Sequence, residues 1–208
     1  SAIYYPADPS SLDGCPCGAE IAIGAAAGTT GTWTLSGGQT FSIGSGASGN
    51  PNASPYVVVG RGDSSSNGTI TLTGSGTEFS MIGDNTGATA QIGRQNCTGT
   101  LNVHDGATFS IYDPNSTSPD NDDAIHLGES GGTGTLDVMG SLIVDGMAPA
   151  DVLTQLESGR GDGSWNGAGI TSSAAAANPQ TSLGFGQTNT SGASPPDGQP
   201  GPGDSVLI

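Results

Sequence analysis

A degenerate phrase that occurs four times constrains the fold of this chain more than any other feature of its sequence. Each copy has a short apolar run ending in Gly, then Gly-Thr followed by alternating apolar and polar residues, then another short run beyond a turn. The Gly-Thr pairs of successive copies lie 37, 31 and 35 residues apart. A repeat of this length is typical of solenoids and propellers. The four Gly-Thr pairs begin at Gly31, Gly68, Gly99 and Gly134.

The three runs in each copy predict strands. Apolar and polar residues alternate in them, as they do in a strand with one buried face. Gly and small polar residues separate the runs, and helical periodicity is absent across residues 19–145. Three strands per copy, forming one rung that stacks on the next, predict a parallel β-helix of triangular section. A propeller blade needs about four strands and 40 or more residues, so it fits less well.

Stacking the copies predicts three columns of inward side chains. The fourth copy joins this register only if its second turn is two residues shorter. The first column is Ile21/Ile23, Val57/Val59, Ala90/Ile92 and Ile125/Leu127; the second is Trp33/Leu35, Ile70/Leu72, Leu101/Val103 and Leu136/Val138; the third is Phe41/Ile43, Phe79/Met81, Phe109/Ile111 and Leu142/Val144.

The predicted fold class is therefore all-β: a short right-handed parallel β-helix of about four three-stranded rungs. The repeats span 19–146 and follow a lead-in of 1–18 that would cap the first rung. Residues 147–186 form a capping segment with one short helix at 149–158, which Pro and Asp begin and a Gly ends. Residues 187–208 form an extended tail rich in Gly, Ser and Pro.

The net charge of the chain limits which binding partners and which cellular locations are expected. The chain has 3 Arg, no Lys and 19 acidic residues, a formal charge of −16. Phosphate neutralisation needs basic residues, so nucleic acid is excluded as a partner. No apolar stretch approaches the roughly 20 residues of a membrane span. The sequence begins at Ser1 without a signal peptide, which suits a mature exported product. We expect an extracellular or cell-surface protein.

The three cysteines leave their pairing open. Cys15 and Cys17 lie in the lead-in, and Cys97 precedes the third Gly-Thr strand. A bridge from either Cys15 or Cys17 to Cys97 would fix the lead-in to the solenoid and leave one thiol for another partner. Zinc is not expected, because His104 and His126 lack ligand spacing to the cysteines.

Two groups of polar residues are further candidates for sites. An acidic cluster precedes the fourth rung. It is either a solvated loop or a site that binds calcium, which is the only cofactor that the sequence suggests. Five asparagines match the glycan-acceptor pattern. The acidic residues are Asp113, Asp120, Asp122 and Asp123; the asparagines are Asn52, Asn67, Asn96, Asn115 and Asn189.

The C-terminal part of the chain carries a resemblance. The segment 158–174, which contains Trp165-Asn166-Gly167-Ala168-Gly169-Ile170, together with Leu183-Gly184 and the end 203–208, resembles secreted, repeat-rich bacterial proteins in which such a segment precedes a dockerin-like module. The rungs resemble the β-strand repeats of autotransporter-type surface proteins. Calcium-binding dockerin repeats are not in this sequence, so no docking function is implied. The resemblance implies export and a surface or matrix role.

No reaction is expected. A polysaccharide lyase needs a basic residue as proton acceptor, and a hydrolase needs paired acids. Arg61 and Arg94 would stack with Glu129 in one outer column, which favours a surface ladder over a grip on an acidic sugar. The outward column Thr34, Thr71, Asn102 and Asp137 holds a single acid.

The function predicted from the sequence is structural. A short β-helix exposes strand edges at its ends, and solenoids cap or use such edges. We predict a non-enzymatic subunit that joins copies of itself head to tail in a filament or surface matrix, with the C-terminal segment at the junction. The alternatives are a carbohydrate-binding or polysaccharide-degrading β-helix with an extracellular polysaccharide as partner, and an adhesin module.

Overall fold

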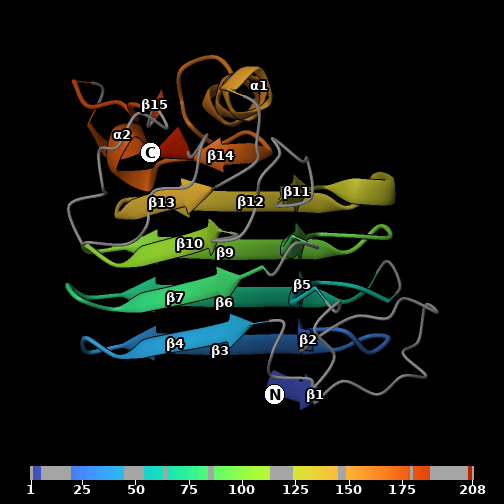
Figure 1. The fold of residues 1–208 in the computed structure, drawn as a ribbon. Helices are drawn as coiled ribbons and strands as arrows, with labels where there is room; N and C mark the ends of the chain where they lie inside the picture. Colours follow the sequence, from blue (N-terminus) through green and yellow to red (C-terminus); the bar gives the residue numbers. More distant parts are fainter. Residues whose placement is uncertain are drawn as a thin grey trace.

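The computed structural model describes residues 2–5, 20–44, 54–62, 65–83, 87–112, 124–144, 149–178, 180–187 and 206–207. Its strands form three sheets that make the three sides of a solenoid (Figure 1). Four rungs, each with one strand from every sheet, follow one another along the chain. In Figure 1 the nearer strands run left to right and the farther ones right to left as the chain climbs, so the coil is right-handed. The predicted parallel β-helix is confirmed.

The first side, sheet A, contains the first strand of every rung. Its rung strands are parallel, and one N-terminal strand pairs antiparallel with β2 at the edge of the first rung. In order, the strands of sheet A are β1 (Ala2–Tyr5), β2 (Glu20–Ile23), β5 (Tyr56–Val59), β8 (Thr89–Ile92) and β11 (Ala124–Leu127).

Sheets B and C form the other two sides, and both extend beyond the fourth rung. Sheet B gains a fifth parallel strand, and sheet C gains two short strands that run antiparallel to each other. Sheet B consists of β3 (Thr30–Ser36), β6 (Asn67–Thr73), β9 (Thr98–His104), β12 (Thr133–Val138) and β14 (Gly169–Thr171). Sheet C consists of β4 (Thr40–Gly44), β7 (Glu78–Ile82), β10 (Thr108–Tyr112), β13 (Ser141–Val144), β16 (Val206–Leu207) and β15 (Gly186–Gln187).

The predicted inward columns form the core. Their strand registers align copy by copy, so Phe41, Phe79, Phe109 and Leu142 lie one above another. In the two middle rungs almost every inward side chain is fully buried. The shorter second turn of the fourth copy is also confirmed, because Leu142 aligns with Phe109 in the parallel pairing of β10 and β13.

Glycines form the corner between sheets A and B, and this corner explains the repeated Gly motif. The Gly that ends each sheet A strand has a positive φ of 64 to 75°, which L side chains rarely adopt. The Gly before each Thr lies against backbone. A Cβ on Gly99 would approach Val59 O at 2.1 Å and Gly93 N at 2.2 Å. Both positions therefore have to be glycine for successive rungs to stack.

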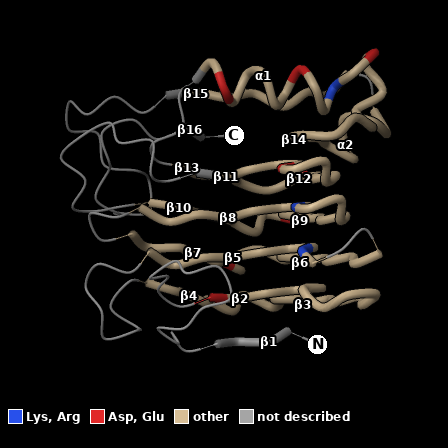
Figure 2. Tube along the Cα trace, turned by 90° about the vertical axis from the view of Figure 1, so that its right-hand side faces the viewer, with Lys and Arg blue, Asp and Glu red and all other residues tan. Residues whose placement is uncertain are grey.

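A capping segment covers the C-terminal end of the solenoid (Figure 2). Helix α1 (Pro149–Arg160) packs on β14 and buries Val152 and Leu156, as the predicted helix should. Helix α2 (Ser173–Ala177) begins where the Ser172 hydroxyl accepts a hydrogen bond from the Ala175 N–H. Within the described part of the chain, neither α-helix has the length and apolar character needed to cross a membrane.

Candidate functional site

The outer faces of the three sheets differ in exposure. On sheet A the outward residues Val58 and Gln91 are buried, and on sheet C the outward Ser80 and Ser110 are buried. Gln91 Oε1 and Ser110 Oγ have no hydrogen-bond partner. Sheet B instead shows regular alternation, with every second residue accessible on β3, β6, β9 and β12. Sheet B is thus the side of the solenoid that is open along its length.

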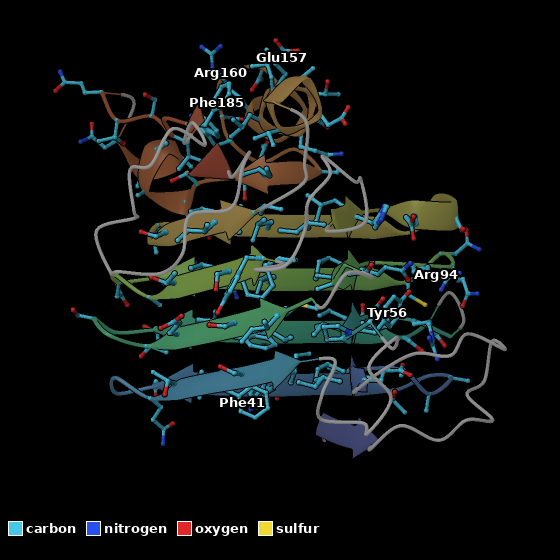
Figure 3. The ribbon with its side chains drawn as sticks, in the orientation of Figure 1. Phe41, Tyr56, Arg94, Glu157, Arg160 and Phe185 are labelled. Carbon is cyan, nitrogen blue, oxygen red and sulfur yellow. The ribbon has the colours of Figure 1, made fainter. Side chains whose placement is uncertain are left out.

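The predicted arginine column lies beside sheet A. The backbones stack as expected, because Arg61 N donates to Gly24 O and Arg94 N donates to Gly60 O. Their guanidinium groups reach down to the strand below. Arg61 lies 3.5 Å from the Glu20 carboxylate, and Arg94 Nη1 donates to the Tyr56 hydroxyl at 3.4 Å (Figure 3). Each arginine therefore ties two consecutive rungs together, whereas the side chain of Glu129, the third member of the predicted ladder, pairs with His126.

Both histidines pair with acids of the fourth rung. His104 Nε2 is 3.0 Å from Asp137 Oδ2, and His126 Nδ1 is 3.1 Å from Glu129 Oε1. Asp137 Oδ1 also accepts a hydrogen bond from Ser173 N at 2.8 Å, which connects α2 to sheet B. Asp137, the single acid of its predicted column, is thus held between the rungs and the cap. The sequence analysis weighed these histidines as zinc ligands and gave no sign of their acidic partners.

Of the three cysteines, only Cys97 lies within the described residues. Cys97 is 1% exposed, and its Sγ lies 3.5 Å from Gln95 O. Cys15 and Cys17 lie outside the described residues, so a bridge between them and Cys97 stays a prediction.

The other predicted sites are only partly described. The acidic residues Asp113, Asp120, Asp122 and Asp123 all lie outside the described residues, and calcium binding there stays a prediction. Across the described ranges, no three His, Cys, Asp or Glu side chains gather in a way that would hold a metal ion. Asn67 and Asn96 are exposed, as a glycan acceptor has to be. The remaining candidate acceptors, outside the described residues, are Asn52, Asn115 and Asn189.

The loop after α1 holds one charged group with a shifted pKa. The Ser164 hydroxyl and backbone N–H act on the Asp162 carboxylate and lower its pKa below 3.8. Because a lowered pKa stabilises the charged form, this contribution is present above the unfolded-state value and is lost as pH falls through the folded one. Asp162 is fully exposed, so solvent screens its charge and its effect on stability is small.

The two ends of the solenoid carry apolar side chains that the fold does not bury completely. At the first rung, Trp33 and Phe41 are partly buried and pack edge to face with a centroid distance of 5.2 Å. At the capped end, Leu153 is 44% exposed and Phe185 is 41% exposed. Figure 3 shows Phe41 at one end of the stack and Phe185 at the other. The sequence pattern counts Leu153 with Val152 and Leu156 among the recurring apolar positions of the helix, but Leu153 is exposed in the structure. Phe185 was not singled out from the sequence.

These features define a right-handed parallel β-helix protein with a cap at its C-terminal end and regular ladders of side chains on its sides. No protein-family model matches the chain, and no curated protein and no solved structure is significantly similar to it.

Proposed function

We propose that this chain is a non-catalytic structural subunit that works outside the cell and joins copies of itself head to tail. The observation that carries the proposal is the position of the accessible apolar residues at opposite ends of the solenoid. Trp33 and Phe41 lie at the first rung, and Leu153 and Phe185 lie on the cap. Contact between the two ends of neighbouring copies would remove both groups from water.

Strand edges at the first rung support the same direction of assembly. Within the described residues, β3 and β4 are the last strands of sheets B and C on this side, so each has an edge that no described strand covers. Such edges are templates for further contact. At the other end β14, β16 and α1 cover the fourth rung. The two ends differ, so their contact is heterologous, and a heterologous contact that does not close gives a filament.

The described part of the C-terminal segment belongs to the cap. Its described residues, Val206 and Leu207, pair with β13 and β15 of the same chain. They complete the cap on which a neighbour would rest. The carbohydrate alternative gains no specific support from Arg61 and Arg94, whose guanidinium groups contact Glu20 and Tyr56 of the rung below. The adhesin alternative likewise has no specific observation in its favour.

The test removes the apolar surface of the cap. Leu153 and Phe185 are exposed, so the double variant Leu153→Ser/Phe185→Ser should fold with an unchanged circular dichroism spectrum. We expect sedimentation velocity and electron microscopy to show polymers for the native protein and monomers for this variant. Glu157→Ser, an exposed change on the same helix, should leave assembly intact.

A mixing experiment tests the head-to-tail geometry. The double variant keeps its first rung, so it should add to the cap of a native subunit and then accept no further copy. Small amounts should therefore shorten native polymers. A native protein that stays monomeric at every concentration would rule out the proposal, as would polymers of equal length with and without the variant.

A further inference from the structure

The open side of sheet B is a two-dimensional array of threonines. Outward positions along β3, β6, β9 and β12 hold Thr at two-residue intervals, and all of these side chains are exposed or half-buried. We call this array the threonine face. It consists of Thr30, Thr32, Thr34, Thr69, Thr71, Thr73, Thr98, Thr100, Thr133 and Thr135.

The strand register makes the array regular. Thr32, Thr69, Thr100 and Thr135 pair directly across the four strands and form one uninterrupted column. Parallel strands lie about 4.8 Å apart, and residues two apart along a strand are separated by about 6.6 Å. The inward residues between them are buried, which fixes the strands beneath the face.

The face carries little charge in a strongly acidic chain. The formal charge of the protein is −16, yet the outward positions of β3 and β6 hold only Thr, Ser and Asn. Charge lies at one margin of the face, where His104 pairs with Asp137 and where Thr73 Oγ1 donates to the Asp105 carboxylate. A partner for this face therefore has to be neutral, rich in hydroxyl groups and periodic in two directions.

Crystalline water meets these three conditions. In a tetrahedral network with O–H···O distances of about 2.75 Å, oxygens that share a neighbour lie about 4.5 Å apart, and layers repeat after about 7.3 Å. Both repeats agree with the spacings of the threonine face to roughly a tenth. Each Thr hydroxyl donates one hydrogen bond and accepts two, as a lattice water requires. We propose that the threonine face binds ice.

Other occupants fit this face less well. Three strands of seven residues and one of six cover roughly 400 Å², about half of the roughly 800 Å² per partner in a stable protein interface. A second copy of the chain would therefore bind weakly through this face alone. A sugar polymer usually stacks on aromatic rings, and the outward positions of β3, β6, β9 and β12 hold none, because Trp33 points into the core.

The experiment measures how much protein enters slowly growing ice, with thermal hysteresis as a second readout. The native protein should concentrate in the ice and delay its growth. Thr100→Lys places a long charged side chain in the middle of the uninterrupted column, and should reduce the fraction in ice at least tenfold, a loss of about 1.4 kcal/mol. Thr40→Lys, an exposed change on sheet C, is the matched control and should behave as the native protein does.

Folding is checked separately, because both lysines project into solvent and should leave the unfolding temperature unchanged. Exclusion of the native protein from ice would overturn the inference, and so would equal effects of Thr100→Lys and Thr40→Lys. Retention on crystalline cellulose without entry into ice would also overturn it and assign the face to a polymer. The threonine face does not involve the two ends of the solenoid, so the monomeric Leu153→Ser/Phe185→Ser variant should still enter ice.

Discussion

A Phe79→Ala variant should lose about 4 kcal/mol of unfolding free energy. Phe79 is fully buried in the second rung and packs edge to face on Trp33, Phe41 and Phe109, with centroid distances of 5.3, 5.5 and 5.3 Å. Removing the ring takes away three aromatic contacts and leaves a cavity between rungs that cannot approach each other, because backbone hydrogen bonds fix their spacing. Urea unfolding followed by circular dichroism measures the loss.

The matched control for this change is Phe41→Ala. Phe41 aligns with Phe79 in the neighbouring strand, but it belongs to the first rung and is only partly buried. Removing its ring leaves a smaller buried cavity, so Phe41→Ala should lower the free energy of unfolding by about 2 kcal/mol. If the two variants lost the same amount, burial within the stack would not be the source of the stabilisation.

Gly99→Ala should destabilise the protein by about 3 kcal/mol, although it adds only a methyl group. The new Cβ would lie 2.1 Å from Val59 O and 2.2 Å from Gly93 N, and neither backbone atom can move without separating the rungs. The melting temperature and the urea midpoint should both fall.

The comparison for Gly99 is a glycine whose strain comes from its dihedral angle alone. Gly37 has a φ of +71°, and a Cβ added to it would meet no atom within 4 Å, so Gly37→Ala should cost about 1 kcal/mol. Gly99 does not have a positive φ, so a loss no larger than that of Gly37→Ala would show that close approach between rungs is not what requires glycine at position 99.

The core could be predicted from the sequence because every rung repeats the same local pattern. Alternation with period two fixes which residues of a strand face inward, and the repeated Gly-Thr sets the register between rungs. For this reason the columns from Ile21 to Leu127 and from Trp33 to Val138 were correct residue by residue. The extent of the helix was also close, since it ends at Arg160, two residues beyond the prediction.

Features outside the repeat could not be predicted in this way. β14 has only three residues, and its pairing with β12 depends on α1 folding over the end of sheet B. β16 joins β13 from more than 60 residues away, with no periodicity to indicate it. Outward residues such as Val58 and Ser110 were expected at the surface by alternation, yet they are buried. Alternation assigns a side chain to a face and says nothing about what covers that face.

The position of the cap at the end of the sequence affects how the protein folds while it is being synthesised. Each rung pairs with the rung that precedes it, so a chain emerging from the ribosome can add rungs one at a time with short loop closures. Until α1 and β16 emerge, however, the newest rung presents an uncovered edge to other nascent chains. Because the cap follows all four rungs in the sequence, the exposed strand edges of the fourth rung are covered only at the end of synthesis. Slow synthesis of residues 145–207 would therefore prolong the interval in which nascent chains can misassemble.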